Sequence, residues 1–339
     1  MRFSWRPVSK QEPSSGRPLK FRCLALLAAL LLVHAAQAQG QYPSRLVRFI
    51  VPIDPGTGPD MLARTIGQRL SEKWGVPVVT ENRPGAGASI GTEFVAKSPA
   101  DGHTILVTAS TLVMYRSLRP SAPYDPIKDF APVVPLAIGQ LALVTHPSLG
   151  VSSIKELVAA AKAKPGSIDY GSPGNGSPHH LAMELFKQAM GIDLTHIPYK
   201  STGGAVQDLL SGQTKVMFLS VSVAIPHIQL KRLNVLSSGG IRRAAATPDS
   251  PSLAEASGVR DIDTDIWFGM FAPSATPAPI VAKLNADVNS VLQLQDVREL
   301  FSRQGLLVTG GKSEELASVT RADLEKWTRV VREAKIQAD

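Results

Sequence analysis

Two glycine-rich loops are the part of this chain whose residues are best suited to bind a ligand. They are Val51–Asp60 (VPIDPGTGPD) and Gly171–His180 (GSPGNGSPHH). Each loop follows an apolar run typical of a strand and precedes a run typical of a helix. Glycine lets the backbone approach a ligand closely, and the N–H groups of a first helical turn need an acceptor. Because this arrangement suits a carboxylate or a phosphate, the sequence predicts two loops that hold one small anion.

Two enzyme motifs overlap in the segment Gly85–Gly91 (GAGASIG). The spacing G-x-G-x-x-x-G is one residue away from the dinucleotide fingerprint, and no acidic residue ends a second strand at the required distance. Gly87–Gly91 also matches G-x-S-x-G, but a nucleophile elbow follows its strand directly. Ser89 instead follows the strand-like run that ends at Thr80 across a long loop. We therefore expect neither a cofactor nor an enzyme.

Two histidines at the end of the second loop could suggest a metal. His180 and Glu184 are spaced i and i+4, as ligands on one face of a helix would be, but zinc needs a third ligand that is not visible. We therefore expect no metal site. We expect His180 to lie near the ligand or at the helix start, and His179 to be solvated.

The order of the predicted elements indicates an α/β protein. The expected strands are 46–51, 78–80, 104–108, 168–170, 194–198, 215–219, 233–237 and 267–272. The expected helices are 59–70, 89–97, 153–164, 178–190, 202–210, 277–294 and 313–335. Such alternation predicts mostly parallel sheets, and about 300 residues predict two domains.

One apolar stretch, 130–147, is too long for a single strand. Two strands that meet near Gly139 and Gln140 fit it better, as a crossing between two lobes. A return crossing fits the segment that leads into Asp265 and the strand after it. We therefore expect residues 39–139 plus 263–339 to form one lobe, and residues 140–262 to form a second lobe inserted into it.

The first 38 residues have the organisation of a secretory signal peptide. A basic region precedes the apolar run Cys23–Val33, and Ala36–Ala38 (AQA) is a cleavage site. The apolar run is well short of the ~20 residues that span a bilayer. Because the leader has no Arg-Arg pair, we expect export to the periplasm through the general secretory pathway and cleavage after Ala38.

Removing the leader changes the composition of the chain. The formal charge of the whole chain is +8. The leader carries six basic residues and one acidic residue, so the mature chain is near +3, which gives no case for nucleic acid binding. The only cysteine, Cys23, leaves with the leader. We therefore expect neither a disulfide nor thiol chemistry.

Taken together, many short motifs resemble one family, the extracytoplasmic solute receptors of the tripartite tricarboxylate transporter family, also called Bug receptors. The resemblance covers essentially the whole mature chain, and its strength lies in the order and spacing of the motifs. They are Tyr42–Ser44, Val51–Pro52, Pro55–Gly56, Asp60, Glu81–Gly87, Asp101–Gly102, Gly171–Pro178, His180–Leu181, Ile197–Lys200, Gly212–Gln213, Pro226–His227 and Gly269–Pro273.

The resemblance implies an α/β, two-lobe periplasmic binding protein of the type II class with its ligand cleft between the lobes. It implies a monomer that binds a small organic acid and delivers it to the subunits of a membrane transporter. A co-receptor for a membrane sensor kinase would use the same cleft, as would a receptor for a neutral or amide ligand, so these alternatives stay open.

The resemblance also implies which residues hold the ligand, since backbone amides and ordered water at the two loops bind the carboxylate in that family. The first loop supplies Ile53, Gly56, Thr57, Gly58 and Asp60. The second loop supplies Gly174, Asn175, Gly176 and Ser177, with His180 just inside the helix. Two hydroxyls at strand ends, Ser110 and Thr202, are further candidates, although such hydroxyls also cap helices.

The first loop departs from the family pattern. The family usually has Phe-Pro-Pro-Gly-Gly where this chain has Ile53–Thr57 (IDPGT). An aromatic contact is lost and a carboxylate, Asp54, is gained. If Asp54 faces the cleft, it repels a dianion or pairs with an amine or a hydroxyl. The hypothesis is a preference for a monocarboxylate or a partly neutral ligand, and the alternative is a solvated turn residue.

Overall fold

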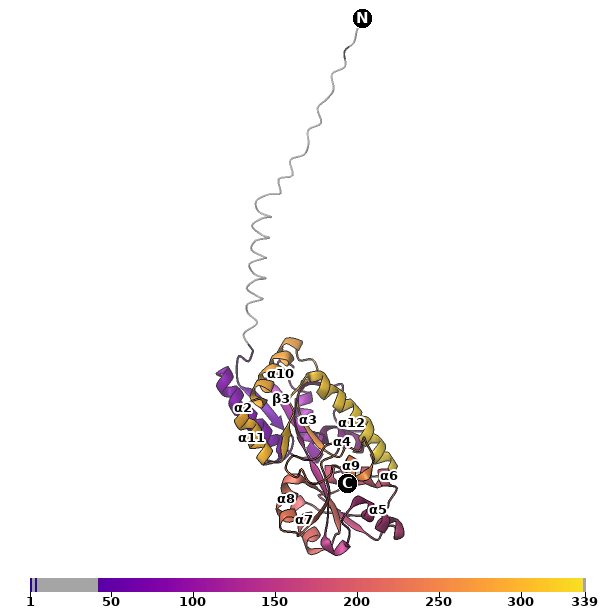
Figure 1. Cartoon of the computed structure of the whole chain (residues 1–339). Helices are drawn as coiled ribbons and strands as arrows, with labels where there is room; N and C mark the ends of the chain where they lie inside the picture. The colour runs from indigo at the N-terminus through magenta and orange to yellow at the C-terminus, as the bar shows by residue number, and fades with distance from the viewer. Residues whose placement is uncertain (2–3, 5–41, 338–339) are drawn as a thin grey trace. The chain divides into compact units, whose positions relative to one another are not determined.

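The computed structural model describes residues 42–337, together with Met1 and Ser4 (Figure 1). Apart from those two residues, the predicted signal peptide lies outside the described part of the chain and stays a prediction. Among the described residues, no helix has the length and the apolar character that a membrane span requires.

A six-stranded sheet contains strands from both ends of the described chain. Its order is β11-β4-β10-β3-β1-β2. The strands are β1 (Val47–Val51), β2 (Val78–Asn82), β3 (Thr104–Ala109), β4 (Phe130–Gly139), β10 (Ile266–Pro273) and β11 (Leu306–Val308). Every residue of β3 is buried, because helices cover both faces of the sheet.

Each face of this sheet packs against three helices (Figure 1). One face carries α2 (Gly58–Trp74), α10 (Ala278–Leu292) and α11 (Gln295–Arg303). The other carries α3 (Ser89–Ala96), α4 (Thr111–Leu118) and α12 (Ser313–Glu333). On the second face the buried Asp323 carboxylate accepts hydrogen bonds from the indole N–H groups of Trp267 (2.8 Å) and Trp327 (3.3 Å). Trp267 is therefore a packing residue.

A five-stranded sheet contains the middle of the chain, in the order β7-β6-β8-β5-β9. Its strands are β5 (Leu141–Thr145), β6 (Asp169–Ser172), β7 (Thr195–Pro198), β8 (Val216–Ser220) and β9 (Asn234–Ser238). One apolar cluster joins it to α5 (Ile154–Ala163), α6 (Pro178–Met190) and α9 (Leu253–Ser257). A second cluster joins it to α7 (Thr202–Ser211) and α8 (Val221–Gln229).

The prediction of mostly parallel sheets is wrong. Four strand pairs are parallel and five are antiparallel. The antiparallel pairs arise where the chain passes between the sheets: β4 ends at Gly139, β5 begins the other sheet at Leu141, and β10 returns antiparallel to both β3 and β4. A returning strand placed between outgoing strands cannot be parallel to them.

The Asp265 carboxylate links the segments that connect the two sheets. Asp265 Oδ1 accepts hydrogen bonds from the N–H groups of Leu141 (3.2 Å) and Gly240 (3.0 Å). Asp265 thus joins the start of β10 to the start of β5 and to the segment after β9. In the same region, Gln140 accepts a hydrogen bond from the N–H of Val221 (3.0 Å) through its carbonyl oxygen. These contacts define the hinge region, Gly139–Leu141 with Gly239–Gly240 and Asp263–Ile266.

Candidate ligand-binding cleft

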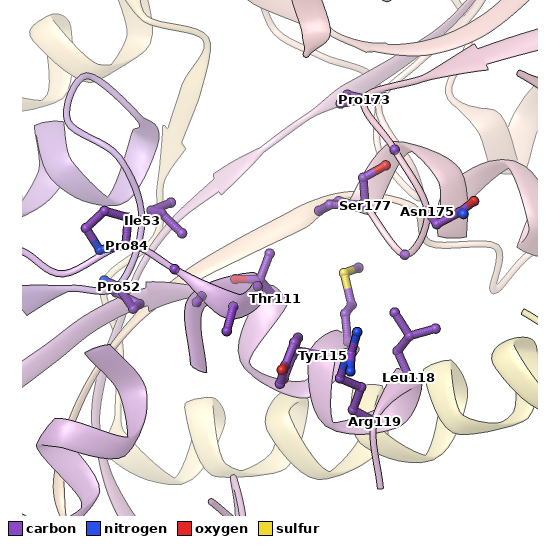
Figure 2. A pocket seen from close by; sticks show the side chains of 18 of the residues that line it. Pro52, Ile53, Pro84, Thr111, Tyr115, Leu118, Arg119, Pro173, Asn175 and Ser177 are labelled. Carbon is purple, nitrogen blue, oxygen red and sulfur yellow. The ribbon is translucent and has the colours of Figure 1, made fainter. Parts of the chain in front are cut away.

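A pocket of about 660 Å³ lies where elements of the two sheets face each other (Figure 2). Four segments form its wall: the loop after β1, the loop after β2 with the short 3₁₀ helix η1 (Ala86–Ala88), one face of α4, and the loop between β6 and α6. Its volume is within the range of small-molecule sites. The lining residues are 52–54, 84–88, 111, 114, 115, 118, 119 and 173–178.

The wall formed by α4 was not predicted as a binding element. Thr111, Met114, Tyr115, Leu118 and Arg119 line the pocket, at the three- and four-residue spacing of one helical face. The Thr111 hydroxyl is buried and has no hydrogen-bond partner within residues 42–337. It therefore provides a polar group that a ligand can satisfy at the start of a helix. The helical spacing of these five residues after β3 was the available sequence signal.

Neither of the two hydroxyls predicted at strand ends lies on the pocket wall. Ser110 is fully buried, and its N–H donates to the carbonyl of Trp267 (2.9 Å). Thr202 begins α7, where the neighbouring Ser201 caps the helix by accepting the Gly204 N–H (3.2 Å). The structure thus places the residue after Ser110, Thr111, in the wall instead.

One part of the first predicted loop lines the pocket, and the other part supports it. Ile53 and Asp54 line the pocket, whereas Gly56, Thr57, Gly58 and Asp60 do not. The buried Asp60 carboxylate accepts the Gly56 N–H (2.9 Å) and pairs with Arg64 (3.0 Å). Burial acts to raise the pKa of Asp60, but hydrogen bonds from Arg64, Gly56 and Asn82 outweigh it and hold the pKa below its usual value. An ionised Asp60 therefore fixes the loop and engages one amide predicted for the ligand.

The second predicted loop lies on the wall through Gly174, Asn175, Gly176 and Ser177. Ser177 also caps α6, because its hydroxyl accepts the His180 N–H (3.3 Å). The backbone φ of Gly176 is +70°, which favours glycine, and a Cβ there would lie 2.3 Å from Leu118 Cδ2 of α4. The loop therefore lies directly against the Leu118 side chain of α4 at Gly176.

His180 is buried behind this loop and does not line the pocket. Its Nδ1 accepts the Gly176 N–H (3.0 Å), and its ring stacks on His196 with 3.9 Å between the centroids. Burial, His196 and Lys187 lower the pKa of His180 to about 3, so the imidazole is neutral and can accept this bond. His180 is a positioning residue for the loop.

His179 differs from its prediction. Both of its ring nitrogens are buried without a hydrogen-bond partner in the described part of the chain, so the expectation of a solvated side chain is wrong. Burial lowers the pKa of His179 to about 4. The imidazole is therefore neutral at physiological pH.

Replacing His180 by phenylalanine is expected to destabilise the protein by about 1 kcal/mol. The ring would still stack on His196, but the Gly176 N–H would lose its acceptor. Urea unfolding at neutral pH measures the change. His227→Phe is the control, because His227 lies outside the pocket wall and its Nδ1 has no hydrogen-bond partner among residues 42–337. Equal stability of H180F and the wild type would show that this hydrogen bond does not hold the loop.

Only two of the described residues that line the pocket are charged, Asp54 and Arg119. Asp54 is exposed at the tip of the first loop, and Arg119 ends α4. The other lining side chains are apolar except for Thr111, Tyr115, Asn175 and Ser177. The pocket can therefore offer one cation, hydroxyl and amide groups, and a large apolar surface.

Comparison with known proteins places this fold among periplasmic solute-binding receptors. A Rhodopseudomonas palustris protein solved with adipate is 32% identical, with a TM-score of 0.74 over 88% of this chain and 99% of that chain. MatC from Rhodopseudomonas palustris, solved with bound malate, is 30% identical, with a TM-score of 0.71 over 86% of this chain and 100% of that chain. The class is therefore an α/β, two-lobe binding protein.

The sequence comparisons identify the family within this class. BugT of Bordetella pertussis is 35% identical over 317 residues, which are 92% of this chain and 97% of that protein. Residues 62–336 match the receptor family of the tripartite tricarboxylate transporters. The chain belongs to this family, as its motifs predicted.

Proposed function

We propose that this receptor captures a small organic acid in the 660 Å³ pocket and delivers it to the membrane subunits of a tripartite tricarboxylate-type transporter. The observation that carries the proposal is the pocket wall, because its four segments come from elements of both sheets. A ligand that contacts both sides favours the arrangement in which they approach each other.

The proposed lobes follow the two sheets. Residues 39–139 with 263–339 form the first lobe, and residues 140–262 form the second. All strands of the six-stranded sheet lie in the first range and all strands of the five-stranded sheet in the second. We further propose that residues 1–38 are a cleaved signal peptide for secretion to the periplasm, and that the mature receptor is a monomer.

The polar groups of the wall suit a carboxylate. The Thr111 hydroxyl and the first N–H groups of α4 can donate to it, and Arg119 supplies a positive charge. The Ser177 hydroxyl of the second loop lies on the same wall. Ser89, the serine of the hydrolase-like motif, is buried at the start of α3.

A thermal-shift screen of the full chain, expressed with its leader and purified after export, tests the proposal. The screen compares small carboxylic acids with their matching amides. Binding to the folded state alone raises the melting temperature, by several degrees for a ligand far above its dissociation constant. We expect shifts with acids that are lost with the amides.

Shifts with amides alone would contradict a carboxylate receptor. A ligand retained through purification would suppress every shift, so mass spectrometry of the denatured protein is the accompanying control. A released organic acid would support the proposal, and a released neutral compound would contradict it.

A further inference from the structure

We propose that the ligand carries a single carboxylate on an apolar body, and that Asp54 is the residue that discriminates against a second carboxylate. This inference rests on the proposed function of the same pocket. The solved relatives named above contain adipate and malate, each of which has two carboxyl groups. The pocket of this chain has a charge pattern that does not suit such a ligand.

The charges on the pocket wall are balanced. Arg119 and Asp54 cancel, so the pocket has no net positive charge with which to hold a dianion. The two groups come from different segments: Figure 2 shows Arg119 at one side of the pocket, beside Leu118, and Ile53, the neighbour of Asp54, at the other. A diacid with one carboxylate near Arg119 would direct the other towards the Asp54 side, where like charges repel.

Two arginines beside the first loop could offset the charge of Asp54 if they faced the pocket. Arg64 pairs with Asp60 (3.0 Å) and donates to the Asn82 side chain (2.8 Å). Arg83 pairs with Glu81 (2.6 Å) and lies over the Phe94 ring, 3.6 Å from its centroid. Both guanidinium groups are engaged away from the pocket, and neither lines it. Arg64 and Arg83 therefore do not offset the charge of Asp54.

The remaining surface of the pocket is mainly apolar. Proline, alanine, isoleucine, leucine and methionine side chains supply most of the wall, and they come from all four segments. Tyr115 adds an aromatic ring that packs on the backbone of Gly87, where a Cβ would lie 2.5 Å from the ring. Binding of an apolar ligand body to such a surface is favourable, because apolar groups of both the ligand and the pocket are removed from water.

Two matched pairs of acids test the inference by isothermal titration calorimetry at neutral pH and low salt. Hexanoate and adipate have the same chain length and differ in the second carboxylate, as do benzoate and terephthalate. In the wild type we expect the monoacid of at least one pair to bind about tenfold more tightly than its diacid. Asp54→Asn should improve the affinity for the diacid several-fold and leave the monoacid affinity nearly unchanged.

Asp249→Asn is the matched control, because Asp249 is exposed, does not line the pocket, and carries the same charge. It should leave both affinities unchanged. Tighter binding of a diacid than of its monoacid by the wild type would overturn the inference, as would a ratio that D54N does not change. Failure of both monoacids to bind would also overturn it. None of these results would contradict the proposed function if other acids still bind in the wider screen.

Discussion

Replacing Gly239 by alanine is expected to lower the free energy of unfolding by about 3 kcal/mol, a large fraction of the stability of a typical domain. Gly239 lies directly after β9 in the hinge region. Its φ of +84° is unfavourable for alanine, and a Cβ there would lie 2.1 Å from the Arg242 carbonyl oxygen and 2.7 Å from Gln140 Nε2. The new methyl group would therefore overlap both the backbone and the hinge.

The backbone around Gly239 leaves little room for adjustment. Its N–H donates to the Leu141 carbonyl (2.9 Å), and its own carbonyl accepts the Leu253 N–H (2.8 Å). Any shift that relieves the overlap would lengthen one of these bonds. The cost is thus the sum of backbone strain, overlap and weakened hydrogen bonds.

Gly258→Ala provides the matched control for this prediction. Gly258 ends α9 with a similar φ of +76°, but nothing lies within 4 Å of a Cβ built there. The Gly258→Ala variant should lower the free energy of unfolding by about 1 kcal/mol, which is the cost of the left-handed backbone conformation alone. Urea unfolding of both variants gives the difference. Equal losses would show that the hinge can move aside, and that its packing does not require glycine.

Sequence reasoning worked best where local chemistry determines the element. The helix 178–190 was predicted with the bounds of α6, because Ser177 caps it, proline occupies its first position, and Gly191 ends it with a φ of +60°. The two strands that meet at Gly139–Gln140 were also predicted, because the apolar run was too long for one strand.

The prediction failed where tertiary packing determines the element. Helix α4 has eight residues, TLVMYRSL, with β-branched and aromatic side chains and no side-chain cap. Its helical form depends on burial of Leu112, Val113 and Met114 against α12 and the sheet. Because α4 was missed, the pocket wall that it forms was missed as well.

The site residues show the same limit. Gly174, Gly176 and Ser177 could be chosen from the sequence because a loop before a helix requires particular backbone angles. Whether a polar group faces the ligand or braces the loop depends on its neighbours in space. Asp60 and His180 each accept an N–H of their own loop, from Gly56 and Gly176, and no sequence pattern distinguishes this role from direct ligand binding.

Asp265 is expected to make the stability of the hinge depend on pH, and Asp265→Asn should remove that dependence. Burial and the neighbouring Asp263 raise the pKa of Asp265 to about 7, even though it accepts hydrogen bonds from Gly240, Leu141 and Gln140. In the unfolded chain the pKa returns to about 4. Between these values the folded state holds a proton that the unfolded state has released.

The direction of the effect follows from this difference in bound protons. The stabilising contribution of the neutral carboxyl is complete below about pH 4 and is lost as the pH rises through about 7. Asparagine keeps the Oδ1 acceptor that both backbone N–H groups use and carries no charge. At about pH 8 the D265N variant should therefore be more stable than the wild type by about 2 kcal/mol, whereas at about pH 4.5 the two should be nearly equal.

His179 and His180 change the stability in the opposite direction with pH, so their effect must be separated from that of Asp265. Burial lowers the pKa values of His179 and His180 to about 4 and about 3, so the unfolded state takes up protons first and stability falls as the pH drops below about 6.5. This loss of stability at acidic pH occurs in both proteins and cancels in their difference.

Urea unfolding of the wild type and D265N from about pH 4.5 to pH 8, with the exposed Asp249→Asn as control, measures the difference in stability. Parallel curves for the wild type and D265N would mean that the hinge carboxylate is ionised throughout. A gap that widens with pH would show that the charge on Asp265 opposes the closely packed hinge, and that the hinge is more stable when this carboxyl is neutral.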